Sequence, residues 1–386
     1  MSNIKEKQKD ILIDVTETFD YSGQSDEYIN AYKKWRNNPD NPFAYNYIKK
    51  KNEVTFCESK GFVKIIPEEK EQKVLSKVLY IFGIILILFL FIQFIFSKIF
   101  IAVLDNFGVN IHNSFLNYSI YGGQKEVMSA MIIITFLKFC VPLLIIKKAL
   151  KMPLNASLPC KLQSSKDLFL CMAICLSVSV LTSISRAYSD SKIEYFTFFN
   201  CYNKEFSLLN QSELVIYMIL DVVIVSIMSE FLFHGAVFQA LRQFGDLYAV
   251  IVTASFSALM TNNIASVFSV FAVSVVAGIS ILRSGTVFTA VAVQIINKIY
   301  LTALTIIELS FSDTSLKKAY FMIICFIIGI AVSSLIWHST NKEIFLKKNL
   351  STFLSAKKKI LLIFTTIPTF TIIFICITII ITSILA

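Results

Sequence analysis

The sequence predicts an all-α membrane protein: a polytopic transmembrane helical bundle of about nine spans, with its N-terminus in the cytoplasm. Of its 386 residues, 55% are apolar and only 16% are charged, and the mean hydropathy is +0.67. The apolar residues, 35 Phe among them, gather in runs close to the roughly 17 to 25 residues that a helix needs to cross a bilayer. Short segments rich in Lys separate several of these runs. This combination excludes an ordinary soluble domain.

Each predicted span is an apolar run bounded by polar or charged residues. The spans are expected at about 78–96, 127–146, 168–184, 214–244, two short helices within 248–282, then 287–307, 319–337 and 360–385. The two short helices should meet at the polar turn Thr261-Asn262-Asn263.

The basic residues between the spans predict the orientation. If the N-terminus is inside, the connections after spans two, four, six and eight are cytoplasmic, where Lys and Arg are enriched. These four connections carry Lys147, Lys148, Lys151, Lys161 and Lys166, then Arg242, then Arg283, then six Lys between 338 and 359. The remaining connections have fewer basic residues or balance them with acids, so the alternation is consistent along the whole chain.

The chain divides into a polar arm over residues 1–76 and a transmembrane domain over residues 77–386. The arm begins without the apolar core of a signal peptide, so we expect it in the cytoplasm. Its segment YINAYKKW predicts a short amphipathic helix, followed by a turn at residues 38–42. This helix has three possible roles that the sequence leaves open: docking on the membrane, docking on a partner, or forming a loose cap.

Neither a metal nor a cofactor is expected. The eight cysteines are scattered without a CxxC pair, which argues against a disulfide framework. Cys171 and Cys175 share a helix face, but packing explains them more simply than metal binding. The chain has three His and no HExxH motif, so a zinc protease site is not predicted. The net charge is +10, but the basic residues do not form a stripe with interleaved aromatics, so no nucleic-acid partner is expected.

The fourth span carries a polar stripe. Ser226, Glu230 and His234 follow one another at i, i+4 spacing, which stacks them on one helical face. An ionisable residue inside a membrane helix is costly and is interpreted as functional by default. Glu230 is a candidate general base that activates water. The alternative is a polar pair that holds helices together. Asp221 should face a different environment and is assigned no chemistry.

The sequence around Glu230 resembles a known family. SEFLFHG at residues 229–235 is similar to the EExxFRG motif of the CPBP family, the CAAX-protease and bacteriocin-processing intramembrane proteases. The resemblance continues through the Phe244-Gly245 link and a Gly-containing helix to about residue 300, with a family-like core at about 166–300. It implies a helical site inside the membrane that hydrolyses membrane-associated peptides through a Glu-activated water.

Within the first motif, the resemblance retains only part of the family's polar set. The first Glu of the motif falls at Ser229, and the second is kept as Glu230. The Arg falls at His234, and the Gly is kept as Gly235.

The later helices depart further from the family. The histidine of the fifth helix falls at Thr261, with Asn262 beside it, and that of the seventh falls at Gln294. The associated Asn falls at Asn297 or Lys298. Thr and Gln form hydrogen bonds but do not act as acid and base near neutral pH.

Three functions remain open. The first is a catalytically impaired relative in the cell membrane, in contact with lipid, that binds a membrane peptide or protein as a scaffold, adaptor or immunity protein. Its partner-binding residues would be Ser229, Thr261, Asn262, Gln294 and Asn297. The second is a divergent active endopeptidase with Glu230 as general base and His234, Asn262 or Gln294 as electrostatic support. The third is an unrelated transporter.

Overall fold

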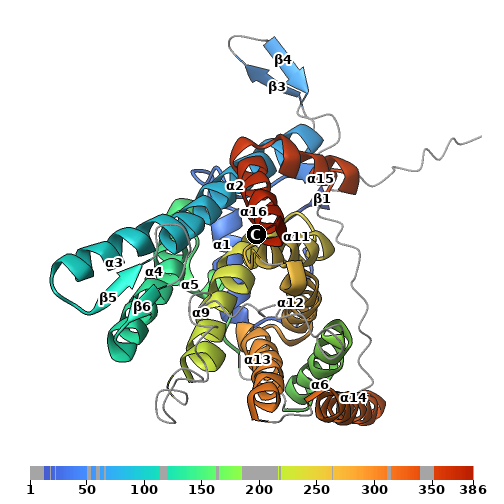
Figure 1. Cartoon of the computed structure of the whole chain (residues 1–386). Helices are drawn as coiled ribbons and strands as arrows, with labels where there is room; N and C mark the ends of the chain where they lie inside the picture. Colours follow the sequence, from blue (N-terminus) through green and yellow to red (C-terminus); the bar gives the residue numbers. More distant parts are fainter. Residues whose placement is uncertain are drawn as a thin grey trace, which may run out of the picture.

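The computed structural model is mainly helical, and this confirms the predicted polytopic bundle (Figure 1). It describes residues 13–17, 19–21, 23–49, 54–57, 61–64, 67–113, 120–161, 165–184, 216, 219–262, 264–310, 314–339 and 352–385. Among the described residues, three short two-stranded antiparallel sheets accompany the helices. They pair β1 (Ile13–Asp14) with β2 (Ile48–Lys49), β3 (Val54–Cys57) with β4 (Gly61–Lys64), and β5 (Ile111–Asn113) with β6 (Ile120–Gly122).

Within the described residues, seven helical stretches are long and apolar enough to cross a membrane. They are α2–η1–α3 (Pro67–Leu90, Phe91–Phe96 and Ser97–Asn106), α4 (Gln124–Leu150), α6 (Ser165–Thr182), η3–α9–η4–α10 (Leu220–Val225, Ser226–Glu230, Phe231–Val237 and Phe238–Arg242), α12 (Ile264–Ser284), α13 (Val287–Ser310) and α14 (Thr314–Ser339). An eighth is formed by α15 (Ala356–Thr365) and α16 (Ile367–Leu385) if this pair, bent by 76°, counts as one span.

If the bent pair is counted, eight of the nine predicted spans are present among the described residues, and the remaining one is a shorter apolar helix. The fifth predicted span is α11 (Asp246–Leu259), which has only 14 residues. At 1.5 Å per residue it is about 21 Å long, shorter than the roughly 30 Å apolar core of a bilayer. The turn after it lies where the sequence predicted, because Thr261 and Asn262 separate α11 from α12.

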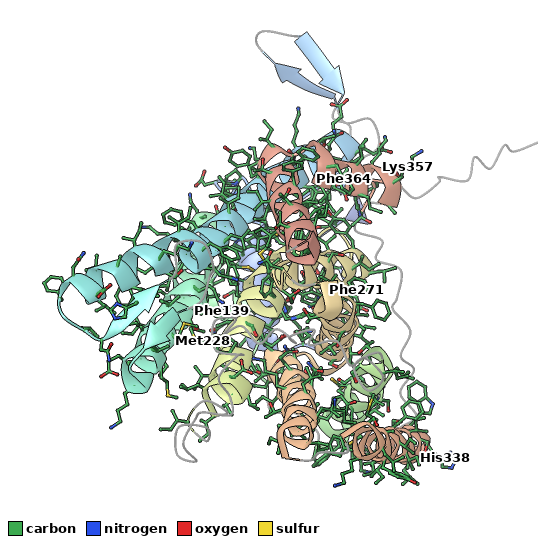
Figure 2. All side chains as sticks on the ribbon, viewed as in Figure 1. Phe139, Met228, Phe271, His338, Lys357 and Phe364 are labelled. Atoms are coloured by element: carbon green, nitrogen blue, oxygen red, sulfur yellow. The ribbon has the colours of Figure 1, made fainter. Side chains whose placement is uncertain are left out.

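The helix that carries Glu230 is the most enclosed of the seven. Of its most apolar stretch, 67% is buried, against 11% for α14. Phe139 of α4 and Met228 of α9 both contribute to the main apolar core, and Figure 2 places them between those two helices. In contrast, α14 packs mainly along α6, where Gly329 lies directly against Ala173 and Ser177. The outer face of α14 is exposed and apolar, as expected for contact with lipid.

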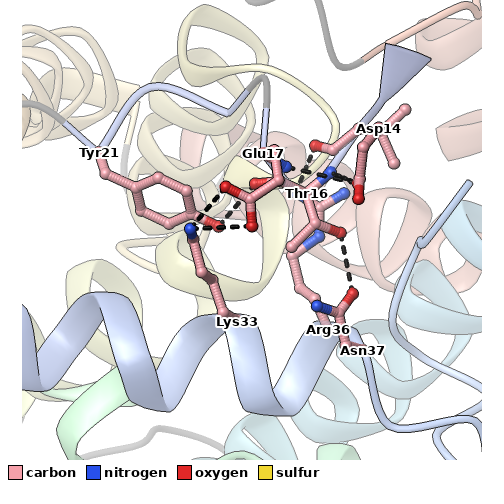
Figure 3. Close-up of polar contacts among 8 residues, drawn as sticks. Asp14, Thr16, Glu17, Tyr21, Lys33, Arg36 and Asn37 are labelled. Carbon is pink, nitrogen blue, oxygen red and sulfur yellow. Dashed lines mark hydrogen bonds and ion pairs between the residues drawn. The ribbon is translucent and has the colours of Figure 1, made fainter. Parts of the chain in front are cut away.

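The predicted helix of the arm is α1 (Asp26–Arg36). Ser25 caps it by accepting a hydrogen bond from the Tyr28 amide at 3.3 Å, and acidic residues in its first turn complement the helix dipole. Polar contacts join α1 to the preceding segment (Figure 3). Lys33 pairs with Glu17 at 2.7 Å, and Thr16 Oγ1 donates to Asn37 Oδ1 at 3.1 Å.

Aromatic residues of α1 dock the arm on the bundle. Trp35 Nε1 donates to the Leu150 carbonyl at the end of α4 at 2.8 Å. The Tyr28 and Tyr32 hydroxyls donate to Gln239 Oε1 and to the Gln239 carbonyl on α10, at 2.7 and 3.1 Å. The sequence left three roles open for this helix. The structure shows it packed against the ends of this chain's own membrane helices, so the cap is the role that it resembles.

The predicted basic connections meet at the end of the bundle where α1 docks. Lys161, after the short helix α5 (Leu154–Ser157), donates to the Gly23 carbonyl at 3.2 Å. Arg242 contacts the Tyr28 hydroxyl at 3.2 Å, and Gly285 lies directly against Gly23. Lys359 donates to the Phe244 carbonyl. The four connections therefore share one end, as their charge predicts, while the side of the membrane that this end faces stays a prediction.

Candidate functional site

The site helix runs without interruption from Leu220 to Arg242, but its winding changes. The π-helical segments η3 and η4 flank the α-helical stretch α9, which ends at Glu230, and α10 continues the helix after η4. Short π-helical stretches are rare in proteins, and those that occur often lie at functional sites. Ser226, Glu230 and His234 are all buried inside the bundle.

Glu230 and His234 form a close buried pair. Glu230 Oε2 lies 2.5 Å from His234 Nδ1, at ion-pair distance but without the angles of a hydrogen bond. Glu230 is 5% exposed and His234 is fully buried. On its other side, His234 Nε2 lies 3.0 Å from the Ser274 carbonyl and 3.3 Å from Ser274 Oγ, both on α12. A carbonyl oxygen only accepts, so this contact assigns a proton to Nε2.

Ser229 does not join this pair by hydrogen bonding. Its hydroxyl donates to the Ser226 carbonyl at 3.1 Å, along its own helix. Ser226 Oγ is buried and has no hydrogen-bond partner among the described residues. The serine at the position that the resemblance assigns to the family's first Glu therefore makes a local contact along its own helix.

A second buried pair, Asp221 with Lys298, was not predicted. Lys298 Nζ lies 2.8 Å from both Asp221 Oδ1 and the Asp221 carbonyl oxygen, and both side chains are buried. Asp221 therefore has a partner of its own on α13, apart from the Glu230–His234 pair, and the expectation that it has no chemical role stays a prediction. Both residues are ionisable groups within apolar helices, which was a usable signal in the sequence.

Asn297 and Lys298 face different neighbours. The sequence left open which of these two positions corresponds to the family's Asn. Asn297 Oδ1 accepts from Ser179 Oγ of α6 at 2.8 Å, whereas Lys298 faces η3. Cys175, one turn before Ser179, donates to the Val293 carbonyl at 3.2 Å. These contacts form a polar seam between α6 and α13 that links them through neutral groups.

Thr261 and Asn262 form hydrogen bonds within their own turn. Thr261 Oγ1 donates to the Ala258 carbonyl at 2.7 Å, and Asn262 Nδ2 donates to the Met260 carbonyl at 3.2 Å. Asn262 has a left-handed backbone, with φ of 54°, and Asn tolerates this better than most residues. These bonds explain why polar residues occur at the end of α11, and a role in binding stays a prediction.

Gln294 lies on α13 at the i−3 and i−4 positions from Asn297 and Lys298, and it is buried. It therefore shares a helical face with the residues that contact α6 and η3. Its predicted role in binding a partner stays a prediction.

Gly235 permits a close approach of the connection before α6. A Cβ atom at this position would lie 2.5 Å from Leu158 Cδ2 and 3.1 Å from the Ser157 carbonyl oxygen. The glycine of the sequence motif is thus explained by packing one residue after His234.

Metal binding is not indicated at this site. Among the described residues, no group of three or more His, Cys, Asp or Glu side chains could hold a metal ion. The buried polar groups around Glu230 instead interact with one another across η3, α9, η4, α12 and α13.

A comparison with protein families confirms the resemblance seen in the sequence. A family model described as "Rce1-like: Type II CAAX prenyl endopeptidase Rce1-like" matches residues 211–300. The matched segment contains the site helix and continues through α13 as far as Tyr300. The chain matches no curated protein and no solved structure.

Proposed function

Taking the Rce1-like segment at residues 211–300 as the premise, we propose that this multi-pass membrane protein binds a membrane peptide or protein partner without cutting it. It acts in the cell membrane as a scaffold, adaptor or immunity protein, with its arm in the cytoplasm. The partner is recognised around Glu230 by Ser229, Thr261, Asn262, Gln294 and Asn297.

The observation that supports this proposal best is the engagement of Glu230 by His234. A general base must reach a water or a substrate proton. Glu230 Oε2 is instead 2.5 Å from an imidazole whose other nitrogen contacts Ser274. The side chain that would activate water is therefore already held by its own helix.

The residues on the neighbouring helices support the same conclusion. Thr261 and Gln294 occupy positions where the family has histidines, and neither side chain exchanges a proton near neutral pH. Loss of members of a catalytic unit typically lowers kcat by factors of about 10⁴ or more. His234 does not replace them geometrically, because it lies on the same helix as Glu230.

The test is a comparison of binding with cleavage in liposomes that contain the purified protein. A panel of photo-crosslinkable peptides, some with a prenylated C-terminus and others wholly apolar, is offered to the parent and to Glu230→Gln. We expect the parent to capture some peptides and leave them intact by mass spectrometry. Ile324→Ala, on the exposed face of α14, is the matched control and should capture peptides like the parent.

The same Glu230–His234 contact also fits a second candidate, a divergent intramembrane endopeptidase. A carboxylate in contact with a histidine is a familiar acid–base arrangement, and Glu230 and His234 have it. In that case the parent releases peptide fragments and Glu230→Gln does not, at equal protein level. This result would replace the binding proposal.

A further inference from the structure

We propose that α15 is an interfacial helix that holds anionic phospholipid headgroups through Lys357 and Lys358. These two lysines, together with the exposed apolar residues Ile360, Leu361 and Phe364, form what we call the α15 surface. The occupant is the membrane around the protein, so the inference does not depend on the role of Glu230.

The bend between α15 and α16 sets the direction of α15 relative to the membrane. Helix α16 has 19 residues and is about 28 Å long, close to the roughly 30 Å apolar core of a bilayer. Helix α15 has only 10 residues, about 15 Å, and turns away from α16 by 76° (Figure 1). With α16 crossing the bilayer, α15 therefore runs close to the membrane plane.

The two faces of α15 differ as they do in an interfacial helix. Its buried residues are Lys359 and Leu362, whereas the three apolar residues of the α15 surface are each more than half exposed. Figure 2 shows Lys357 in the first turn of α15 and Phe364 in its last turn. A long lysine side chain beside apolar residues reaches a headgroup while its methylene groups stay in contact with acyl chains.

The charge of this segment is complementary to an anionic headgroup. Residues 352–386 contain three Lys and no acidic residue. The first three turns of α2, against which α15 packs, carry equal numbers of Glu and Lys and so leave this charge uncompensated. Lysines in the first turn of a helix oppose the helix dipole, so their placement does not serve the stability of α15 itself.

One of the two lysines has a partner within the protein, and this pair is weak. Lys358 Nζ lies 3.0 Å from Glu68 Oε2 of α2, with side chains that are 59% and 47% exposed. An ion pair that is open to solvent contributes little and is screened by salt. Lys358 therefore remains accessible to a headgroup phosphate.

The third lysine of α15 fixes the helix to the bundle. Lys359 is 5% exposed, lies 3.2 Å from Glu71 Oε1 and donates to the Phe244 carbonyl, two residues after α10 ends. The other oxygen of Glu71 accepts from the Phe353 and Leu354 amides at 2.7 and 2.8 Å. Lipid on the α15 surface therefore contacts a helix that is joined both to α2 and to the end of the site helix.

The experiment places a tryptophan on the α15 surface, L361W, in a Trp337→Phe background. The purified protein is reconstituted in phosphatidylcholine bilayers that contain brominated phosphatidylglycerol or, at the same mole fraction, brominated phosphatidylcholine. Bromine on the acyl chains quenches tryptophan fluorescence on contact, and Trp35 is shielded because it is buried. We expect the anionic lipid to associate with this position about fivefold more strongly, and less so at high salt.

The charge variant is K357Q/K358Q in the same L361W background. It removes both positive charges from exposed positions, so it should fold like the parent and be quenched equally by the two lipids. A preference that survives in this variant would overturn the role of the two lysines. Equal quenching in the parent, or weak quenching by both lipids, would show that the α15 surface holds no anionic headgroup.

Two controls separate this surface from the rest of the protein. K148Q/K151Q removes two exposed lysines at the end of α4, at the same end of the bundle, and should leave the preference at L361W unchanged. Its loss there would assign the effect to the overall charge of that end and contradict the proposal. I324W, on the exposed face of α14, should be quenched equally by both lipids, and an equal preference at this position would also contradict it.

Discussion

At the scale of single residues, the ionisable groups of the site helix each lie against a polar partner. Glu230 is held by His234, His234 by Ser274, and Lys298 by Asp221. An unpaired ionised group inside the bundle would cost several kcal/mol, so this mutual pairing is what makes the cluster tolerable in an apolar environment.

The first prediction concerns Glu230→Leu. We expect this variant to insert and fold, because an apolar side chain is cheaper than a carboxylate within a membrane helix. The measurement is the yield of monodisperse protein after extraction in detergent, with Ile324→Ala as the control. A collapse of the yield for Glu230→Leu alone would mean that the stripe serves mainly to hold helices together.

The second prediction concerns Gly235→Ala. The added methyl group would meet Leu158 Cδ2 and the Ser157 carbonyl, so we expect a loss of about 1 to 3 kcal/mol in stability, as for other overpacked sites. Thermal unfolding in detergent measures the loss. Leu158→Ala removes one of the two obstacles, so in the double variant the loss of stability from Gly235→Ala should be smaller. If the two losses of stability simply add, the contact between these residues is contradicted.

The third prediction concerns pH and Tyr28. Burial raises the pKa of this tyrosine from 10 to about 12, which means that the docked arm keeps its proton when the released arm has lost it. Stability from this group is therefore fully present below pH 10 and falls as the pH rises toward 12. Protease cleavage of the arm across this range reports the change, and Tyr28→Phe should make its pH dependence weaker.

At the scale of elements, α1 acts as part of the helical bundle. It contacts the ends of α4 and α10, and the segments beside it contact the α12–α13 turn at Gly285. Because α10 continues the helix that carries Glu230 and His234, the arm fixes the end of the site helix.

The fourth prediction tests this docking with the two tryptophans of the chain. Trp35 is 4% exposed and donates to the Leu150 carbonyl, so Trp35→Ala should cost about 3 to 5 kcal/mol and release α1 to proteases. Trp337 on α14 is 51% exposed, and Trp337→Ala is the matched control with a small expected effect. Equal protease sensitivity of the two variants would contradict the docking of α1.

At the scale of the whole molecule, the basic connections and the arm occupy one end of the bundle. The turn after α3 belongs to the first connection between spans, which the sequence predicts on the outer side. The fifth prediction uses Phe107→Cys at this turn, where the native side chain is 83% exposed. In a background with Cys57, Cys160 and Cys201 changed to Ser, a membrane-impermeant thiol reagent should label Phe107→Cys only from outside the cell. Labelling from the cytoplasm alone would reverse the predicted orientation.

The sequence by itself determined the helical membrane class, most of the span positions and the family resemblance. Apolar runs and basic connections reflect the cost of moving residues into lipid, which depends on local composition. Glu230 and His234 were found because their i, i+4 spacing lies within one helix. Of the two short helices predicted between residues 248 and 282, α11 is short with 14 residues, whereas α12 has 21 residues and is long enough to cross a membrane.

Only the tertiary structure decided which polar groups meet across helices. Asp221 and Lys298 are 77 positions apart, and Ser274 and His234 are 40 apart, so their contacts depend on how helices cross and rotate. The docking of Trp35 on Leu150 is equally remote in sequence. Local sequence determines the cost of placing a charge in the membrane, whereas its partner is set by packing between helices, where contact energies are summed over the whole bundle.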